Sequence, residues 1–212
     1  MKKIIPILIL PLLLLTSCFG VDFEIALNAD GSGIITLEYR VSRAFDAIGR
    51  LDGNARWNTI PVGLSDFERS LERLPNIRLL SFAAAEDARD KIITARMEFL
   101  SIEGLLEFLD ATGQRTSLSA NGNENSLILT LNEGFSVSSP ELALLLASVS
   151  SGYSVRLGMR FPGEGNMEVS DNQGRLIQEA GEFERDGSRV FASFPLYQVL
   201  NAGEGMNVQF RW

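Results

Sequence analysis

No histidine occurs among the 212 residues, and cysteine occurs once, as Cys18. Without histidine the chain lacks the usual general base near neutral pH, the commonest metal ligand and the base of a Ser-His triad. A single cysteine excludes an internal disulfide. No GxxxxGK(S/T) or GxGxxG pattern stands between a strand and a helix to hold phosphate groups. The sequence therefore predicts no catalytic residue, no metal site, no cofactor and no enzymatic activity.

Carboxylates are the reactive side chains that remain. Glu103 and Glu107 are four residues apart, so they share one helix face, and paired acids at the right separation carry out glycosidase chemistry. We interpret them instead as a solvated helix face. Two further groups in predicted turns carry oxygen ligands for calcium but lack the EF-hand spacing, so turn chemistry explains them more simply: Glu86, Asp87 and Asp90, and the cluster at 121–125.

Basic residues are also in deficit. The chain has 19 Lys and Arg against 27 Asp and Glu, a net charge of −8. Loss of Lys2 and Lys3 with a cleaved leader makes the mature chain more negative still. Such a field repels nucleic acids and anionic lipid surfaces, so we expect neither as a partner.

The chain also lacks an apolar run long enough to span a bilayer. Residues 4–15 are apolar and contain two prolines. As a helix they cover about 18 Å, whereas a bilayer core of about 30 Å needs about 20 residues. Lys2 and Lys3 precede the run and the small Ser17 follows it, which is the layout of a secretory signal peptide. We expect residues 1–17 to be a leader that is removed.

The tetrapeptide Leu15-Thr16-Ser17-Cys18 resembles the lipobox of bacterial lipoproteins. The resemblance implies cleavage between Ser17 and Cys18, diacylglycerol on the thiol and an acyl group such as palmitate on the new amine. Two or more acyl chains anchor a protein stably, since each buried methylene contributes about 0.8 kcal/mol. The chain would then sit in the bacterial cell envelope, on the extracytoplasmic side of a membrane. The alternative is an ordinary signal peptide that is cut elsewhere, with an incidental cysteine.

After a short tether at 18–20, alternating apolar residues predict three hairpins around polar turns: 21–27 with 35–41, 77–84 with 91–99, and 116–120 with 126–131. A helix follows each hairpin. The first opens with a Ser65/Glu68 capping box and runs to 74, the second is capped by Ser101, and the third covers 139–150. We expect an α+β fold in which antiparallel hairpins carry helices on one face as ββα units.

The remainder is rich in strand signals, near 153–161, 167–170, 190–194 and 206–212. We therefore divide the mature chain into an α+β domain of ββα units at 21–134 and a part at 135–212 that holds the third helix and a β-rich C-terminal region. The two form one continuous domain if the third helix joins them in a single core.

The third predicted helix is apolar on all sides between 142 and 149. All-round hydrophobicity normally marks a buried core helix, which is our preferred interpretation. The functional alternatives are the wall of an apolar pocket or a face pressed on the membrane interface. Ligand pockets are concave and mostly apolar, and the candidate lining is Leu142, Leu144, Leu145, Leu146, Leu157 and Met159.

Two stretches of the C-terminal half resemble the LppM-like lipoprotein family of bacterial surface proteins: VRLGMRFPGE at 155–164 and DNQGR at 171–175. The opening is similar too, with a lipobox cysteine, a strand, an Asp-Gly turn and a second strand. The resemblance implies an envelope lipoprotein with a role in lipid or glycolipid binding. Some relatives carry a C-terminal membrane helix, whereas this sequence ends in Phe210-Arg211-Trp212, so anchoring would rest on Cys18 alone.

The sequence thus predicts a membrane-anchored envelope lipoprotein that serves as a non-enzymatic binding or structural module, with a lipid or another hydrophobic molecule as a candidate ligand. The alternative is an assembly factor that docks on another envelope protein through a sheet edge or through the 139–150 helix. A hydrolase that uses carboxylates alone is the weaker alternative.

Overall fold

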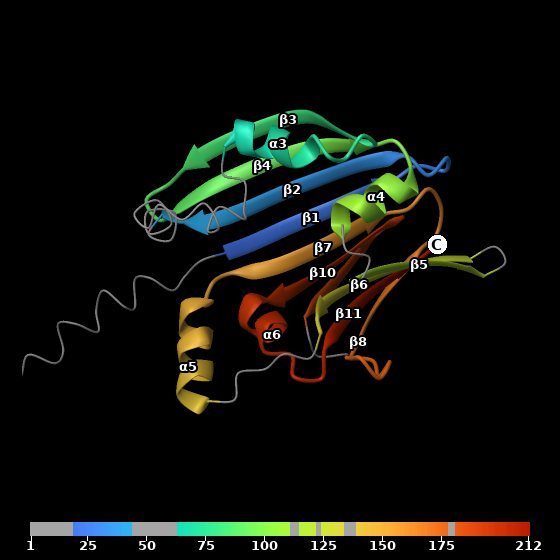
Figure 1. Ribbon diagram of the computed structural model, residues 1–212. Coiled ribbons are helices and arrows are strands. Elements are labelled where there is room, and N and C mark those ends of the chain that lie inside the picture. Colours follow the sequence, from blue (N-terminus) through green and yellow to red (C-terminus); the bar gives the residue numbers. More distant parts are fainter. Residues whose placement is uncertain (1–18, 44–62, 111–114, 122–123, 134–138, 178–180) are drawn as a thin grey trace, which may run out of the picture.

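The computed structural model describes residues 19–43, 63–110, 115–121, 124–133, 139–177 and 181–212. The strands of these residues form two sheets that pack against each other (Figure 1). The larger sheet has seven strands in the order β3-β4-β2-β1-β7-β10-β9, and the smaller has four in the order β5-β6-β11-β8.

The strands of the large sheet are β1 Phe19–Leu27, β2 Gly33–Ser42, β3 Ile77–Glu86, β4 Asp90–Phe99, β7 Ser154–Arg160, β9 Glu182–Asp186 and β10 Arg189–Pro195. Those of the small sheet are β5 Thr116–Asn121, β6 Glu124–Asn132, β8 Asn166–Ser170 and β11 Met206–Arg211. The three predicted hairpins are confirmed as the antiparallel pairs β1–β2, β3–β4 and β5–β6. Strand β9 was not predicted from the sequence.

Four helices are described: α3 Leu64–Leu71, α4 Ile102–Leu109, α5 Pro140–Val149 and α6 Leu196–Leu200. The predicted cap of α4 is confirmed, because the Ser101 hydroxyl accepts the backbone N–H of Gly104 at 3.3 Å. The predicted capping box of α3 is wrong. The extended backbone of Gly63 starts that helix earlier, and its carbonyl oxygen accepts the N–H groups of Asp66 and Phe67, so Ser65 lies inside the helix. The short α6 was not predicted.

The expected series of ββα units is not confirmed. The third hairpin leaves the large sheet, and its strand β6 pairs with β11. The sheet is also not purely antiparallel, since β7 runs parallel to β1 with Val21 opposite Val155. The parallel pair arises because the connection through α5 returns the chain to the end of the sheet where β1 begins. The described chain is mostly β with a few helices, and each sheet combines strands from before and after residue 134.

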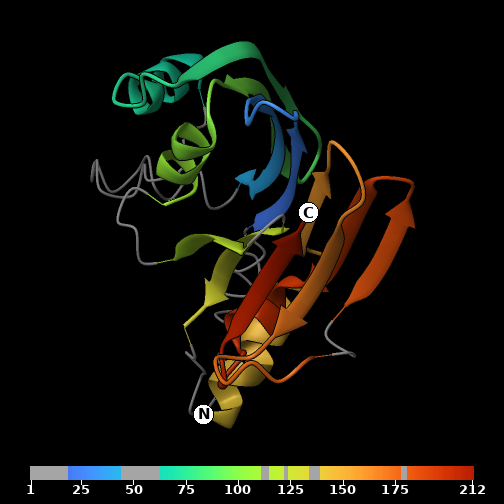
Figure 2. The ribbon, with the colours of Figure 1, turned by 90° about the vertical axis from the view of Figure 1, so that its right-hand side faces the viewer.

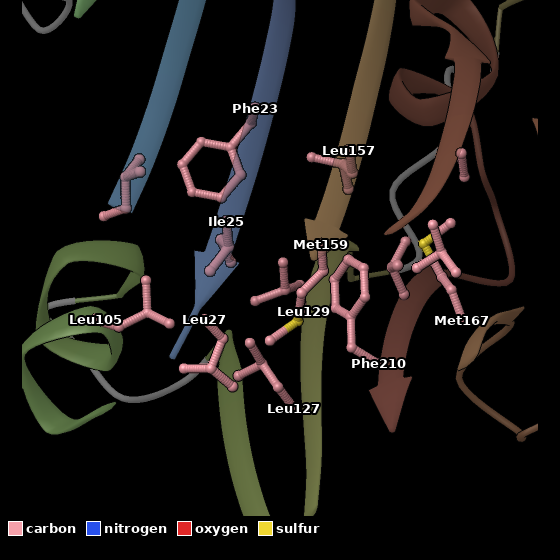
Figure 3. Packing of buried hydrophobic residues seen from close by; sticks show 14 of the residues in the cluster. Phe23, Ile25, Leu27, Leu105, Leu127, Leu129, Leu157, Met159, Met167 and Phe210 are labelled. Atoms are coloured by element: carbon pink, nitrogen blue, oxygen red, sulfur yellow. The ribbon is translucent and has the colours of Figure 1, made fainter. Parts of the chain in front are cut away.

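The core lies between the two sheets. The large sheet curves around the small one, and α3 and α4 lie on the same concave side (Figure 2). Odd-numbered residues of β1 and β7 face this side, where they meet side chains from α4 and the small sheet (Figure 3). The largest fully buried side chains include Ile25, Leu105, Leu127, Met159 and Phe210.

The opposite, outer face of the large sheet is polar and built from cross-strand pairs. Phe191 of β10 lies on Gly158 of β7, where a Cβ would come within 2.3 Å of its ring. The guanidinium groups of Arg156 and Arg189 lie 3.8 and 4.5 Å from the centre of the same ring. Arg189 also donates from Nε to Glu24 of β1 at 2.8 Å. The aromatic ring on this face is therefore enclosed by two paired arginines.

Candidate functional site

The described fold begins one residue after Cys18. Ser17 and Cys18, the predicted cleavage and lipidation residues, lie outside the described residues. Phe19 is the first residue of β1 and stands opposite Val41 of β2. Consecutive Cα atoms are about 3.8 Å apart, so a group attached to residue 18 is attached to this end of the large sheet. We call residues 19–20, 42–43, 86–90, 149–154 and 195–200 the anchor end. Strand pairing brings its strand ends together, and the Leu196 N–H donates to the carbonyl oxygen of Tyr153 at 3.0 Å.

Tyr153 ties the strands of the anchor end together. Its hydroxyl donates to Oδ1 of Asp90 at 2.7 Å, and both residues are buried. Its ring lies on Gly20, where a Cβ would be 3.3 Å from ring atom Cδ1. The Arg89 guanidinium lies 4.9 Å from the ring centre. The hydrogen bond joins β4 to the segment before β7 across β2 and β1, so it fixes the start of β1. No local sequence pattern indicates this pair, because the two residues are 63 positions apart.

Asp87 organises the turn between β3 and β4. Its Oδ1 accepts the backbone N–H groups of Asp90 at 2.6 Å and of Arg89 at 2.8 Å. These bonds, that from Asp90 first, hold the pKa of Asp87 below its ordinary value. The predicted turn chemistry is therefore confirmed for Asp87, while Asp90 binds Tyr153. Within the described ranges, His, Cys, Asp and Glu side chains nowhere gather in a group of three that could hold a metal ion.

A depression of about 270 Å³ lies beside Tyr153 on the outer face of the sheet. Arg156 pairs with Asp22 at 3.3 Å, and Arg40 pairs with Glu38 at 3.4 Å. Because acids and bases alternate and pair, the depression is a polar surface of mixed charge rather than a site for one anion or cation. Its lining is Gly20, Val21, Asp22, Glu38, Arg40, Gly152, Tyr153, Ser154 and Arg156.

The structure does not bring the predicted apolar pocket together. Leu157 and Met159 lie in the core at 5% and 0% exposure, because they are on the face of β7 that points to the small sheet. Leu144 of α5 is 73% exposed. The side chains of Leu142, Leu145 and Leu146 lie outside the described part of the structure. The preferred interpretation of α5 as a core helix is therefore wrong at Leu144.

Other surface depressions occur among the described residues. One of about 400 Å³ lies between α6 and the 171–177 turn, and one of about 420 Å³ lies beside Trp212. An apolar depression of about 210 Å³ between β8 and β9 is lined by Met167, Glu168, Val169, Leu176, Ile177 and Phe183. Small-molecule pockets usually measure about 300–1,000 Å³, so this apolar depression accommodates only a short group.

The acids to weigh for catalysis are Glu103 and Glu107, the pair that the sequence presents, and Asp171, a buried acid that the structure adds. Glu103 and Glu107 are exposed on α4, as the solvated helix face predicted. Asp171 is buried and accepts the N–H groups of Gln173 at 2.8 Å and Arg175 at 3.0 Å, together with Nε of Arg175 at 2.6 Å. Burial works to raise the pKa of Asp171, but the bonds from Arg175 and Gln173 prevail and lower it. A general acid needs a raised pKa, so Asp171 lacks that property.

Of the helices in the described ranges, none combines the length and the apolar composition of a membrane-spanning segment.

No protein-family model matches the chain, and no curated protein matches it. Among solved structures, the NMR structure of the folded domain of the LppM protein from Mycobacterium tuberculosis is similar. It shares 19% identity and a TM-score of 0.44, and the match covers 93% of this chain and 91% of that chain. These values describe a distant likeness between the two chains. They assign no ligand and no role to any residue.

Proposed function

We propose that the protein is a bacterial envelope lipoprotein, held on the extracytoplasmic side of a membrane by acyl chains on Cys18, whose domain serves as a non-enzymatic binding or structural module. The observation that carries the proposal is the junction at residues 15–19. The lipobox-like Leu15-Thr16-Ser17-Cys18 ends where β1 begins at Phe19. The first described strand therefore begins one residue after the predicted cleavage and lipidation point.

The surroundings of the acids support a role without catalysis. Asp90 and Asp171 are the buried carboxylates among the described residues, and each is held by hydrogen bonds within the fold. Asp90 joins two segments of the anchor end, and Asp171 organises the turn after β8. These hydrogen bonds explain why both acids are buried, because a buried polar group must be paired to be tolerated.

The size of the described depressions bears on the ligand. Of the depressions named above, the most apolar one, between β8 and β9, has a volume of about 210 Å³. Buried hydrophobic side chains from both sheets meet between them (Figure 3). A lipid carrier needs a larger apolar cavity. These observations favour a structural or docking role for the domain over that of a carrier for a whole lipid molecule.

Metabolic labelling with a palmitate analogue tests lipidation. The wild type is expected to incorporate label, and Cys18→Ala is expected to incorporate none, because the chain has no second cysteine to accept diacylglycerol. Ser17→Ala is the matched control: it keeps a small residue before the scissile bond and is expected to label like the wild type. Equal labelling of the wild type and Cys18→Ala would end the proposal.

A second candidate function, docking on a partner envelope protein, is favoured by the edge strand β3. Edge strands present unpaired backbone groups that can bind another strand, and proteins usually protect them with charges. Strand β9, at the other edge, has the protected sequence EFERD. Strand β3 has no charged residue between Arg78 and Glu86, and its residues 83–85 are exposed.

Photo-crosslinking distinguishes the two edges. A photoreactive amino acid at Ala83 of β3 is expected to capture one discrete partner in cells, and the same residue at Arg185 of β9 is expected to capture none. Both positions are exposed on edge strands, so they differ in the chemistry of the edge rather than in accessibility. The same yield of adducts at both positions would count against docking through β3.

A further inference from the structure

Helix α5 is apolar on all sides in sequence, and Leu144, the leucine of this helix whose side chain the structure describes, is exposed. Its sequence PELALLLASV holds one charged residue, Glu141. A helix of this composition is normally buried. Leu144, near its middle, is 73% exposed, more than any other large apolar side chain described. Leu144 therefore presents to its surroundings the kind of surface that proteins usually remove from water.

The position of α5 indicates what covers it. The helix leads through Gly152 to Tyr153, whose ring rests on Gly20, the second residue of β1. Figure 1 shows α5 at the end of the molecule where β1 and β7 begin, running across the strand direction rather than along it. It therefore lies at the same end as the residue that follows Cys18.

We propose that α5 lies in the interfacial region of the lipid bilayer, along the membrane plane, with Leu144 at the boundary between headgroups and acyl chains. This inference rests on the proposed lipidation of Cys18. Acyl chains one residue before β1 hold the anchor end at the bilayer surface, and the bilayer is then the apolar medium nearest to α5. Interfacial helices bury their apolar face about 5–10 Å into the headgroup and acyl boundary.

Apolar burial, rather than charge, drives this contact. The chain is acidic overall, with a net charge of −8, and anionic lipids would repel it. Beside the anchor end, Arg40 is paired with Glu38 and Lys91 lies 4.0 Å from Glu86. Within it, Arg43 donates to the backbone carbonyl oxygen of Asp87 and Arg89 lies over the Tyr153 ring. The contact is therefore expected on zwitterionic lipid, where nothing attracts the protein except its acyl chains and the apolar side chains of α5.

The opposite end of the sheet supplies a matched control position. Leu100 follows β4 and is 56% exposed. It adjoins Phe99, the strand partner of Gly33. Gly33 also pairs with Leu27, at the far end of β1. At about 3.3 Å per residue, Leu27 lies about 26 Å from the start of β1. A probe at position 100 thus replaces a leucine, as the probe at position 144 does, but at a position that the proposal places in water.

The experiment uses the full lipidated protein in phosphatidylcholine vesicles. Leu144→Cys and Leu100→Cys are each labelled with a thiol-reactive environment-sensitive fluorophore; acylation of Cys18 leaves the introduced thiol as the reactive one. Both replaced side chains are exposed, so the fold is retained, and circular dichroism verifies this. Lipids that carry a nitroxide near the headgroup are then added. The label at 144 is expected to shift its emission to the blue and lose intensity, and the label at 100 to keep both.

Each outcome of this experiment supports or refutes the proposed position of α5. Quenching at 144 alone supports the proposal. If both variants float with the vesicles and neither label is quenched, or both are quenched equally, the orientation is refuted while lipidation stands; the first result would instead favour a protein partner on α5. If neither variant floats with the vesicles and Cys18 is still alkylated by the fluorophore, the proposed function fails, and the inference fails with it.

Discussion

Replacing Tyr153 with phenylalanine should loosen the anchor end without unfolding the domain. The change removes the hydroxyl that donates to Asp90 at 2.7 Å and keeps the ring that rests on Gly20. Asp90 is only 5% exposed, so water replaces the lost donor poorly. A hydrogen bond to a charged group contributes about 1.5–3 kcal/mol. We expect the free energy of unfolding to fall by about 2 kcal/mol, which lowers Tm by about 4–8 °C for a chain of this length.

Urea unfolding of residues 19–212 measures the loss, and hydrogen exchange localises it. Backbone amides at the start of β1 should exchange faster in Tyr153→Phe, since the bond to Asp90 holds that strand across its neighbours. Tyr197→Phe is the matched control, because Tyr197 is 40% exposed and its hydroxyl accepts one bond from Gln198 at 3.4 Å. The control should change stability by less than about 0.5 kcal/mol. Wild-type stability in Tyr153→Phe, or equal losses in both variants, would refute the reasoning.

Three further substitutions test the core, the outer face and the turn after β8. Leu105→Ala should lower the free energy of unfolding by about 2–5 kcal/mol in chemical denaturation, because Leu105 is fully buried; a loss below about 1 kcal/mol would show that α4 does not pack there. Gly158→Ala should cost about 1–3 kcal/mol, since its Cβ would overlap the Phe191 ring, whereas Gly163→Ala, with no neighbour within 4 Å, should be nearly neutral. Asp171→Asn should destabilise the domain at neutral pH, and a thermal unfolding series should show the difference shrinking in acid.

The sign of that pH dependence follows from the lowered pKa of Asp171. A carboxyl whose pKa is lower in the folded than in the unfolded chain stabilises the fold at pH values above its unfolded pKa. This stabilisation is lost as the pH falls through the folded pKa, when both states become protonated. The wild type and Asp171→Asn should therefore converge only in strong acid. A stability difference that does not vary with pH would contradict the assignment.

Local patterns predicted the elements of the fold well. The first hairpin followed from alternation on either side of Asp30-Gly31, and Gly31 indeed has a φ of +84°, which the turn requires. The cap at Ser101 was equally readable, since its hydroxyl needs only an N–H three residues later. These features depend on neighbours in sequence, because the interactions that stabilise them form between residues a few positions apart.

The assembly of the elements could not be predicted in the same way. The sequence of residues 116–132 does not indicate that β6 pairs with β11 rather than with the first two hairpins. Hairpins of either sheet have the same alternation of apolar and polar residues. Strand β9 is exposed throughout and has no apolar alternation to reveal it. For α5, hydrophobicity indicates that the helix avoids water but does not identify what covers it. The proposed lipidation of Cys18 could be inferred from the sequence because a processing signal is a local pattern.

Mass spectrometry of the mature N-terminal peptide is the decisive test of lipid anchoring. We expect a peptide that begins at Cys18, with diacylglycerol on the sulfur and an acyl chain on the amine. A chain that begins at another residue, or an intact leader followed by a Cys18 thiol that is open to alkylation, would contradict it.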